Sequence, residues 1–193
     1  MTRRRFLFDT PDRFVAGTVG QPGNRTFFLQ ARDAGRLVSV ALEKVQVAAL
    51  AQRLDELLDE LAKRGVEGAG EDDSLVGDTG ALDEPLNEAF RVGTLSLGWD
   101  TADDLVLVEA REVVEEDDDV EGEEDADDEE LPADDDEDGP DVLRIRVTAR
   151  VAREFVARAV RVLAAGRPPC PLCGQPLDPQ GHLCPRRNGH LLN

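Results

Sequence analysis

Three cysteines and two histidines, the residues of this chain best suited to bind a metal ion, all lie within its last 24 residues. Cys170 and Cys173 form a Cys-x2-Cys pair that is followed directly by Gly174, and Cys184 lies eleven residues after the pair. Two intervening residues let the chain fold back so that both sulfur atoms reach one ion at about 2.3 Å. Gly174 permits the left-handed turn that directs backbone N–H groups at a thiolate. The pattern predicts a structural Zn²⁺ site.

The fourth ligand is expected to be a histidine, because the position that would complete a second Cys-x2-Cys pair holds Arg187. His182 lies two residues before Cys184, and alternate side chains of an extended segment point the same way. His182 is therefore the favoured fourth ligand, and His190 is the alternative. Catalytic zinc sites keep an open position, and the tail lacks the carboxylate motifs that accompany them, so a closed structural site is favoured. The competing interpretation is three free thiols in an unstructured tail.

The net charge of −20 is concentrated in one segment of the chain. Residues 115–140 hold 18 of the 42 acidic residues and no lysine or arginine, whereas residues 141–193 carry nine arginines against three acidic residues. The simplest interpretation of the arginines is a solvated helix face. The alternative is anion binding, including binding of nucleic acid, by six of them: Arg144, Arg146, Arg150, Arg153, Arg158 and Arg161. The acidic segment is then a candidate to lie over Arg144 and Arg146, although a disordered, solubilising insertion explains it more simply.

The first third of the chain predicts three strands and a helix. Strands are expected over residues 12–20, 25–32 and 36–42, separated by turn sequences at 21–24 and 33–35 that are rich in Gly, Pro, Asn and Asp. A helix is expected over residues 43–64, because apolar residues recur there at intervals of three and four: Val47, Leu50, Leu54, Leu57, Leu58 and Leu61. Residues 65–87, rich in Gly, Asp and Glu, are expected to form an exposed connector.

The same pattern returns in the second half of the chain. Residues 14–19 resemble 90–95, residues 29–33 resemble 108–112, and residues 40–43 align with 145–148. The last offset exceeds the one before it by 26 residues, which is the length of segment 115–140, so we interpret that segment as a disordered insertion into a hairpin. A second helix is expected over residues 149–165, with Thr148 as its N-cap and Val151, Phe155, Ala159 and Val162 as its buried stripe.

The predicted fold is therefore α+β. Two antiparallel βββα units, residues 1–65 and 88–166, form one body (1–166), and residues 167–193 form the zinc-knuckle tail. The alternative is a single α+β domain containing two unrelated hairpin–helix elements.

Other features limit the classes of function. No stretch approaches the roughly 20 apolar residues of a membrane helix, and the basic amino end lacks the apolar core of a secretory signal, so a cytoplasmic protein without membrane contact is expected. Both histidines lie in the tail, which leaves none for a Ser-His-Asp triad elsewhere, and there is no glycine-rich phosphate loop. A non-enzymatic accessory or regulatory protein with a protein partner is the leading hypothesis. Nucleic-acid binding through the second helix and the knuckle is the first alternative, and an enzyme with a site between the two units is the second.

Four stretches of the chain are distinctive when taken together. They are Asp9–Gly20, Arg25–Arg32, Leu42–Lys44 and Pro169–Asp178. These stretches resemble an actinobacterial family of conserved hypothetical proteins that is catalogued as domain of unknown function 3090. The resemblance spans nearly the whole chain apart from the acidic segment. It implies an actinobacterial cytoplasmic protein, and it supplies no catalytic residues.

Overall fold

The computed structural model describes residues 3–21, 23–70, 77–114, 139–165 and 171–172. These residues form a mixed α/β fold with one seven-stranded sheet and two helices, which confirms the predicted class at this level. Along the chain the elements are β1 (Arg5–Asp9), β2 (Arg13–Gln21), β3 (Asn24–Asp33), β4 (Arg36–Leu42), α1 (Lys44–Lys63), β5 (Glu88–Asp100), β6 (Leu105–Glu112), β7 (Val142–Val147) and α2 (Ala149–Ala164). Most of the predicted acidic insertion and of the predicted knuckle lies outside the described residues.

The sheet has the strand order β1-β7-β6-β5-β4-β3-β2. β2, β3 and β4 form an antiparallel meander that leads into α1, and β5, β6 and β7 form another that leads into α2. The two meanders meet where β4 and β5 run parallel over a short stretch. β1 adds a parallel edge strand beside β7, and the sequence does not predict it because only five residues, among arginines, carry its alternation. The descent of the two meanders from one duplicated unit stays a prediction.

The tight turns lie where the sequence predicts them. β2 ends at Gln21 and β3 begins at Asn24. β3 and β4 are joined by Ala34 and Gly35, whose φ angles are 46° and 82°. Positive φ at both central residues gives a two-residue turn the twist that an antiparallel hairpin needs, and Gly35 adopts it without steric cost.

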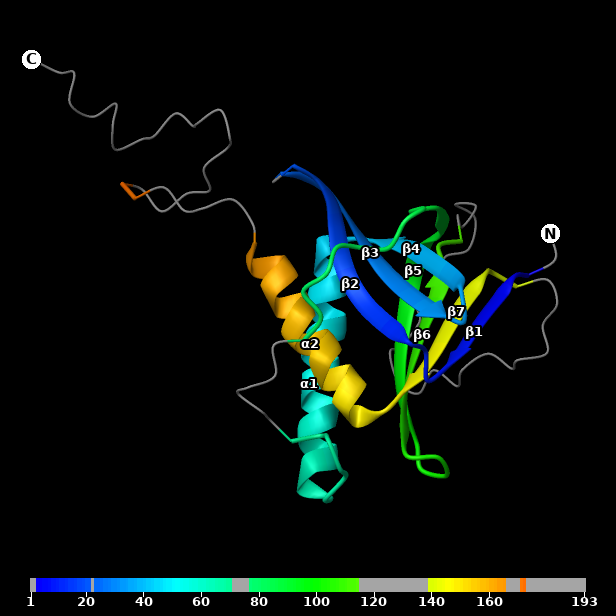
Figure 1. Cartoon of the computed structure of the whole chain (residues 1–193), viewed down its shortest axis with the longest axis vertical. Coiled ribbons are helices and arrows are strands. Elements are labelled where there is room, and N and C mark those ends of the chain that lie inside the picture. Colours follow the sequence, from blue (N-terminus) through cyan, green and yellow to red (C-terminus); the bar gives the residue numbers. More distant parts are fainter. Residues whose placement is uncertain (1–2, 22, 71–76, 115–138, 166–170, 173–193) are drawn as a thin grey trace, which may run out of the picture.

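Both helices pack on one face of the sheet and against each other (Figure 1). α1 begins where predicted, and the backbone N–H of Glu43 donates to Oε1 of Gln46 at 2.8 Å. The predicted stripe of α1 is buried, except that Leu57 is only partly covered. α2 begins after Thr148, whose hydroxyl accepts from the N–H of Val151 at 3.4 Å, as predicted for an N-cap.

The contact between α2 and β2 is built around one aromatic pair. Phe155 of α2 stacks on Phe14 of β2 with ring centroids 4.5 Å apart and planes 8° from parallel. Of the predicted stripe of α2, Phe155 and Ala159 are buried, whereas Val151 and Val162 are partly buried against the same core. The stack holds α2 against the edge of the sheet and adds stabilisation beyond the area that the two rings bury.

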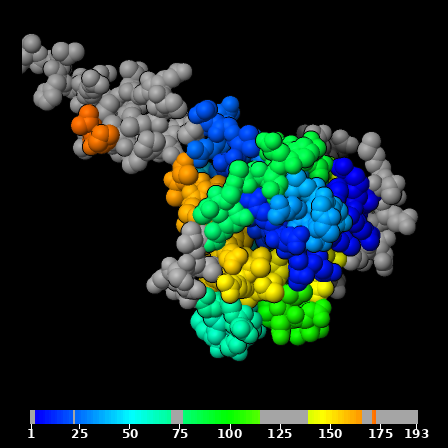
Figure 2. All heavy atoms as spheres, in the orientation of Figure 1, coloured from blue at the N-terminus to red at the C-terminus, as the bar shows by residue number. Residues whose placement is uncertain are grey.

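The second half of the predicted exposed connector is exposed or half-buried, and it also packs on the body. Residues 77–87, here called the crossover segment, lie against α2 (Figure 2) and continue onto the face of the sheet opposite the helices. Gln30 alternates with the core residues Leu29 and Ala31 and so points to that opposite face. Its side chain accepts from the N–H of Asp83 at 2.8 Å and donates to the carbonyl of Asp83 at 3.1 Å. The crossover segment therefore covers part of the second face before it enters β5.

Candidate functional site

The predicted metal ligands Cys170, Cys173, His182, Cys184 and His190 all lie outside the described residues. Within the described part of the chain, no group of three or more His, Cys, Asp and Glu residues is arranged to hold a metal ion. The structure does fix the point from which the tail departs. The guanidinium of Arg25, which follows the β2–β3 turn, donates from NH1 to the carbonyl of Ala165 at 2.6 Å. The zinc site itself stays a prediction.

Two of the six candidate anion-binding arginines are buried within the protein. Arg153 is 7% exposed and binds Asp55 and Asp59 of α1, each at 2.5 Å, and its Nε donates to the carbonyl of Ala69. Arg158 is 5% exposed, and its Nε donates at 2.6 Å to the carbonyl of Ala16 on β2. Both guanidinium groups serve as links between elements of the fold.

The two arginines of β7 point away from the core and meet carboxylates of neighbouring strands. Arg144 binds the buried carboxylate of Glu109 at 2.7 Å, and Arg111 binds the other oxygen of the same carboxylate. Arg146 contacts three carboxylates, and these hold its pKa above the usual value: Asp103, Asp100 and Asp9. Arg144 and Arg146, the arginines that the sequence analysis considers as contacts of the acidic segment, thus already face carboxylates of the body.

The remaining two candidate arginines are exposed on α2. Arg150 lies 3.4 Å from Glu154, one helical turn further on. Arg161 donates from NH2 to the carbonyl of Asp78 at 3.0 Å. The structure therefore does not gather the six arginines on one face, since they lie on β7 and on both the buried and the exposed sides of α2. Anion binding by these residues stays a prediction.

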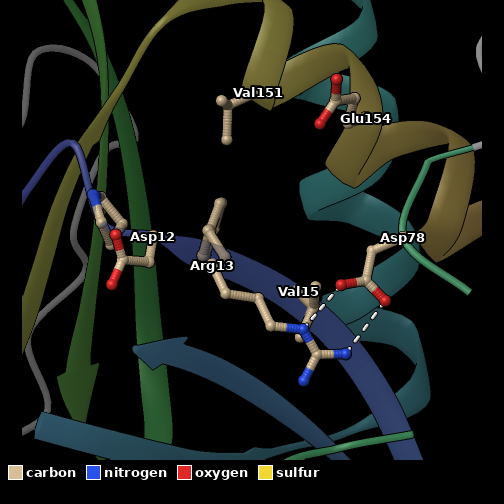
Figure 3. A pocket seen from close by; sticks show the side chains of 8 residues that line it. Asp12, Arg13, Val15, Asp78, Val151 and Glu154 are labelled. Carbon is tan, nitrogen blue, oxygen red and sulfur yellow. Dashed lines mark hydrogen bonds and ion pairs between the residues drawn. The ribbon is translucent and has the colours of Figure 1, made fainter. Parts of the chain in front are cut away.

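A cluster of charges that the sequence does not reveal joins the crossover segment to β2 and α2. Arg13 donates two hydrogen bonds to the carboxylate of Asp78, at 2.6 and 3.0 Å (Figure 3). The third nitrogen of Arg13 lies 2.9 Å from the carboxylate of Asp83. Arg158 donates to the same carboxylate at 2.7 Å and to the backbone carbonyl of Asp78 at 2.8 Å. The N–H of Gly80 adds a further donor at 2.7 Å.

This surrounding lowers the pKa of the Asp78 carboxyl from 3.8 to about 2, chiefly through the hydrogen bonds from Arg13. Asp78 in turn raises the pKa of Arg13. Burial lowers the pKa of Arg158, and the neighbouring Asp78 opposes that effect. A carboxyl group with a pKa near 2 stays ionised at neutral pH, so it has no proton to give and little tendency to take one. The cluster is suited to holding the crossover segment in place and poorly suited to acid–base chemistry.

A small pocket of about 90 Å³ opens beside this cluster, where β2 meets α2. Figure 3 shows Asp78 and Arg13 joined at one side, with Glu154 projecting from α2 and Asp12 at the start of β2. A second hollow, of about 210 Å³, lies between α1 and β5 and is mainly apolar, with Leu95 among its lining residues. The first hollow has room for only a few water molecules, whereas the second has room for side chains of a ligand.

One comparison with known proteins places the chain. A family model described as "Protein of unknown function (DUF3090)" matches residues 6–184. The chain belongs to this family. The match includes most of the described body of this DUF3090 protein, and it also includes Cys170, Cys173, His182 and Cys184, but it ends before His190. No curated protein and no solved structure matches the chain.

No helix of the described residues is long and apolar enough to cross a bilayer. The polar residues that the sequence analysis missed are Gln30 and Glu109, which are buried in the sheet, and the half-buried Asp78 of the crossover segment. For Gln30 and Glu109 a signal exists, because each lies between two apolar residues, Gln30 in a predicted strand and Glu109 in the segment that resembles it. Asp78 carries no such signal, because it lies among the Gly and acidic residues of the connector.

Proposed function

We propose that this DUF3090 protein is a non-enzymatic accessory or regulatory binding protein whose carboxyl-terminal tail is ordered by structural Zn²⁺. The observation that carries the proposal is the spacing of the tail residues, a Cys-x2-Cys-Gly sequence followed by His-x-Cys. Cys170, Cys173 and Cys184 supply three thiolates, and His182 supplies an imidazole. His182 is favoured over His190 as the fourth ligand because it lies two residues from Cys184, on the same side of an extended segment.

The donor set suits this role. Three sulfur ligands and one nitrogen give the four-coordinate, closed arrangement of structural zinc sites. A tail of 27 residues from 167 to 193, with five prolines beyond Pro168 and no aromatic residue, has few side chains with which to build a core of its own. Binding of the metal would then supply the free energy that orders it.

The test is the zinc content of the full chain, purified without a histidine tag. One equivalent of zinc is expected by elemental analysis, and a thiol-blocking reagent should release it. Cys173→Ser should reduce the content to background, because a three-ligand site holds zinc far less tightly. His182→Ala should weaken zinc binding by at least tenfold, and His190→Ala serves as the matched control. Metal-free protein, or a full equivalent of zinc in Cys173→Ser, would overturn the proposal.

A second measurement separates this function from nucleic-acid binding. The full chain is titrated with labelled RNA and with labelled DNA at two salt concentrations. Binding to a polyanion through several arginines must weaken steeply as salt rises, because counterions are released. The proposal expects no saturable, salt-sensitive binding at physiological salt. A submicromolar affinity that falls with salt, and that Arg150→Ala reduces, would favour the nucleic-acid function instead.

A further inference from the structure

β5 is much longer than the strand that it meets on one side. It runs from Glu88 to Asp100, and β6 pairs with it from Val92 to the end. On the other side β4 pairs with it only at Glu88 and Arg91, because β4 ends at Leu42 and the chain turns into α1. Within the described residues, the β4 side of β5 therefore has no strand partner beyond Arg91.

On each of the other two open strands, one backbone carbonyl accepts a hydrogen bond from an arginine side chain. Arg158 donates to the carbonyl of Ala16 on β2, and Arg36 donates to the carbonyl of Leu7 on β1. Gln46 of α1 does the same at the start of the open part of β5, donating to the carbonyls of Val92 and Gly93 at 3.0 and 3.1 Å. From Thr94 to Trp99, no side chain of the described residues makes such a bond to the backbone. This stretch keeps the unpaired donors and acceptors of an edge strand.

A groove of about 210 Å³ runs beside this edge, between β5 and α1. Leu95 and Leu97 line it from β5, and Ala49 and Leu50 line it from α1. Leu95 and Leu97 are only partly buried, although both face the helix side of the sheet. Arg53 closes the lining, and its exposed guanidinium has no carboxylate partner among the described residues. The feature combines backbone groups, apolar surface and one positive charge.

We propose that the edge of β5 from Thr94 to Trp99 and the groove beside it bind an extended segment of a partner protein. The segment pairs with β5 as an added strand, inserts an apolar side chain at alternate positions between Leu97 and Ala49, and places a carboxylate against Arg53. This deepens the proposed binding function by naming the form of the partner, and it does not depend on the zinc tail.

The composition of the chain's own acidic segment argues against it as the occupant. Residues 115–138 contain Val120 and Leu131 as their only large apolar residues, eleven positions apart, and Pro132 cannot donate to a ladder. An added strand needs apolar residues two positions apart to fill one groove. A segment from another protein with that alternation fits the groove better.

The probe is a fluorescein-labelled decapeptide of alternating valine and threonine that ends in three glutamates, titrated into the full chain by fluorescence anisotropy. Saturable binding is expected, together with slower amide exchange at Thr94–Trp99 in the bound protein. Ala49→Trp should weaken binding more than tenfold by filling the groove, whereas Ala48→Trp, on the neighbouring exposed position, should change it less than twofold. Arg53→Glu should weaken binding about fivefold, and a peptide ending in lysines should reverse that preference.

A second peptide, with prolines at alternate positions, controls for the backbone ladder and should not bind. Three results would overturn the proposal: no saturable binding of the first peptide up to millimolar concentration, equal effects of Ala48→Trp and Ala49→Trp, or no change in exchange at Thr94–Trp99. A concentration-dependent dimer that Ala49→Trp abolishes would also overturn it, because the edge would then belong to a second copy of this chain. A zinc measurement on the same protein reports the tail separately, so failure of one proposal is distinguishable from failure of the other.

Discussion

Asp78→Asn tests whether the charge cluster holds the crossover segment to the body. The pKa of Asp78 falls from 3.8 to about 2 in the folded protein, and at about 1.4 kcal/mol for each pH unit this sets an upper limit near 2.5 kcal/mol on the stability that its ionised form contributes. The side chain is 35% exposed, so solvent screening reduces the expected loss at pH 7 to about 1–1.5 kcal/mol. Urea unfolding, followed by the fluorescence of Trp99, measures it.

The pH dependence makes the test specific. Because the folded pKa lies below the unfolded one, the contribution of Asp78 is fully present above pH 3.8 and is lost as the pH falls towards 2. About half of the difference between the wild type and Asp78→Asn should therefore remain at pH 3. Glu67→Gln, at an exposed position without a partner among the described residues, is the control and should give no such trend. A gap that stays constant between pH 7 and pH 3 would show that the Asp78 ion pairs do not stabilise the fold.

Two further substitutions test a buried polar contact of the sheet and the packing of the crossover segment on it. Glu109→Gln should lower the free energy of unfolding by about 3 kcal/mol, because it leaves Arg111 and Arg144 without the buried carboxylate that both contact; a loss below 1 kcal/mol in urea unfolding would contradict this. Gly17→Ala should cost about 1–3 kcal/mol, since its Cβ would lie 2.6 Å from side-chain atoms of Leu82. Faster amide exchange in the crossover segment should accompany that loss, and unchanged exchange would argue against the contact.

The elements that follow a simple period could be predicted, and the contacts between distant segments could not. The α1 stripe has a clear 3.6-residue period, and the turn at Ala34 and Gly35 has its own sequence signature, so their bounds are correct to within a residue or two. The crossover segment has neither a regular period nor a turn signature. Its position depends on single hydrogen bonds to distant residues, such as that between Asp83 and Gln30. The acidic and glycine-rich composition of this segment predicts exposure to solvent, and only the structure shows which side chains contact it.

The same distinction between local patterns and distant contacts explains which candidate sites could be predicted. The spacing of the tail cysteines is local, so the metal hypothesis arises from sequence alone. The arginines of α2 have helical spacing, but only the fold shows that Arg153 and Arg158 are buried on Asp55 and Asp78. The open edge of β5 arises because β4 ends sooner, and a difference in the length of two paired strands is invisible before the pairing is known.

The place of β1 determines when the protein can finish folding during its synthesis. Arg5 pairs with Val142, a separation of 137 residues, and at about 5–20 residues per second the ribosome needs roughly 7–27 s to make the intervening chain. During that interval the ring of Phe8, which is 2% exposed in the folded protein, lacks the strand that helps to cover it. The β1 segment therefore stays unpaired until β7 has been made. A nascent polypeptide stalled before Val142 would leave the apolar residues of β1 available to chaperones.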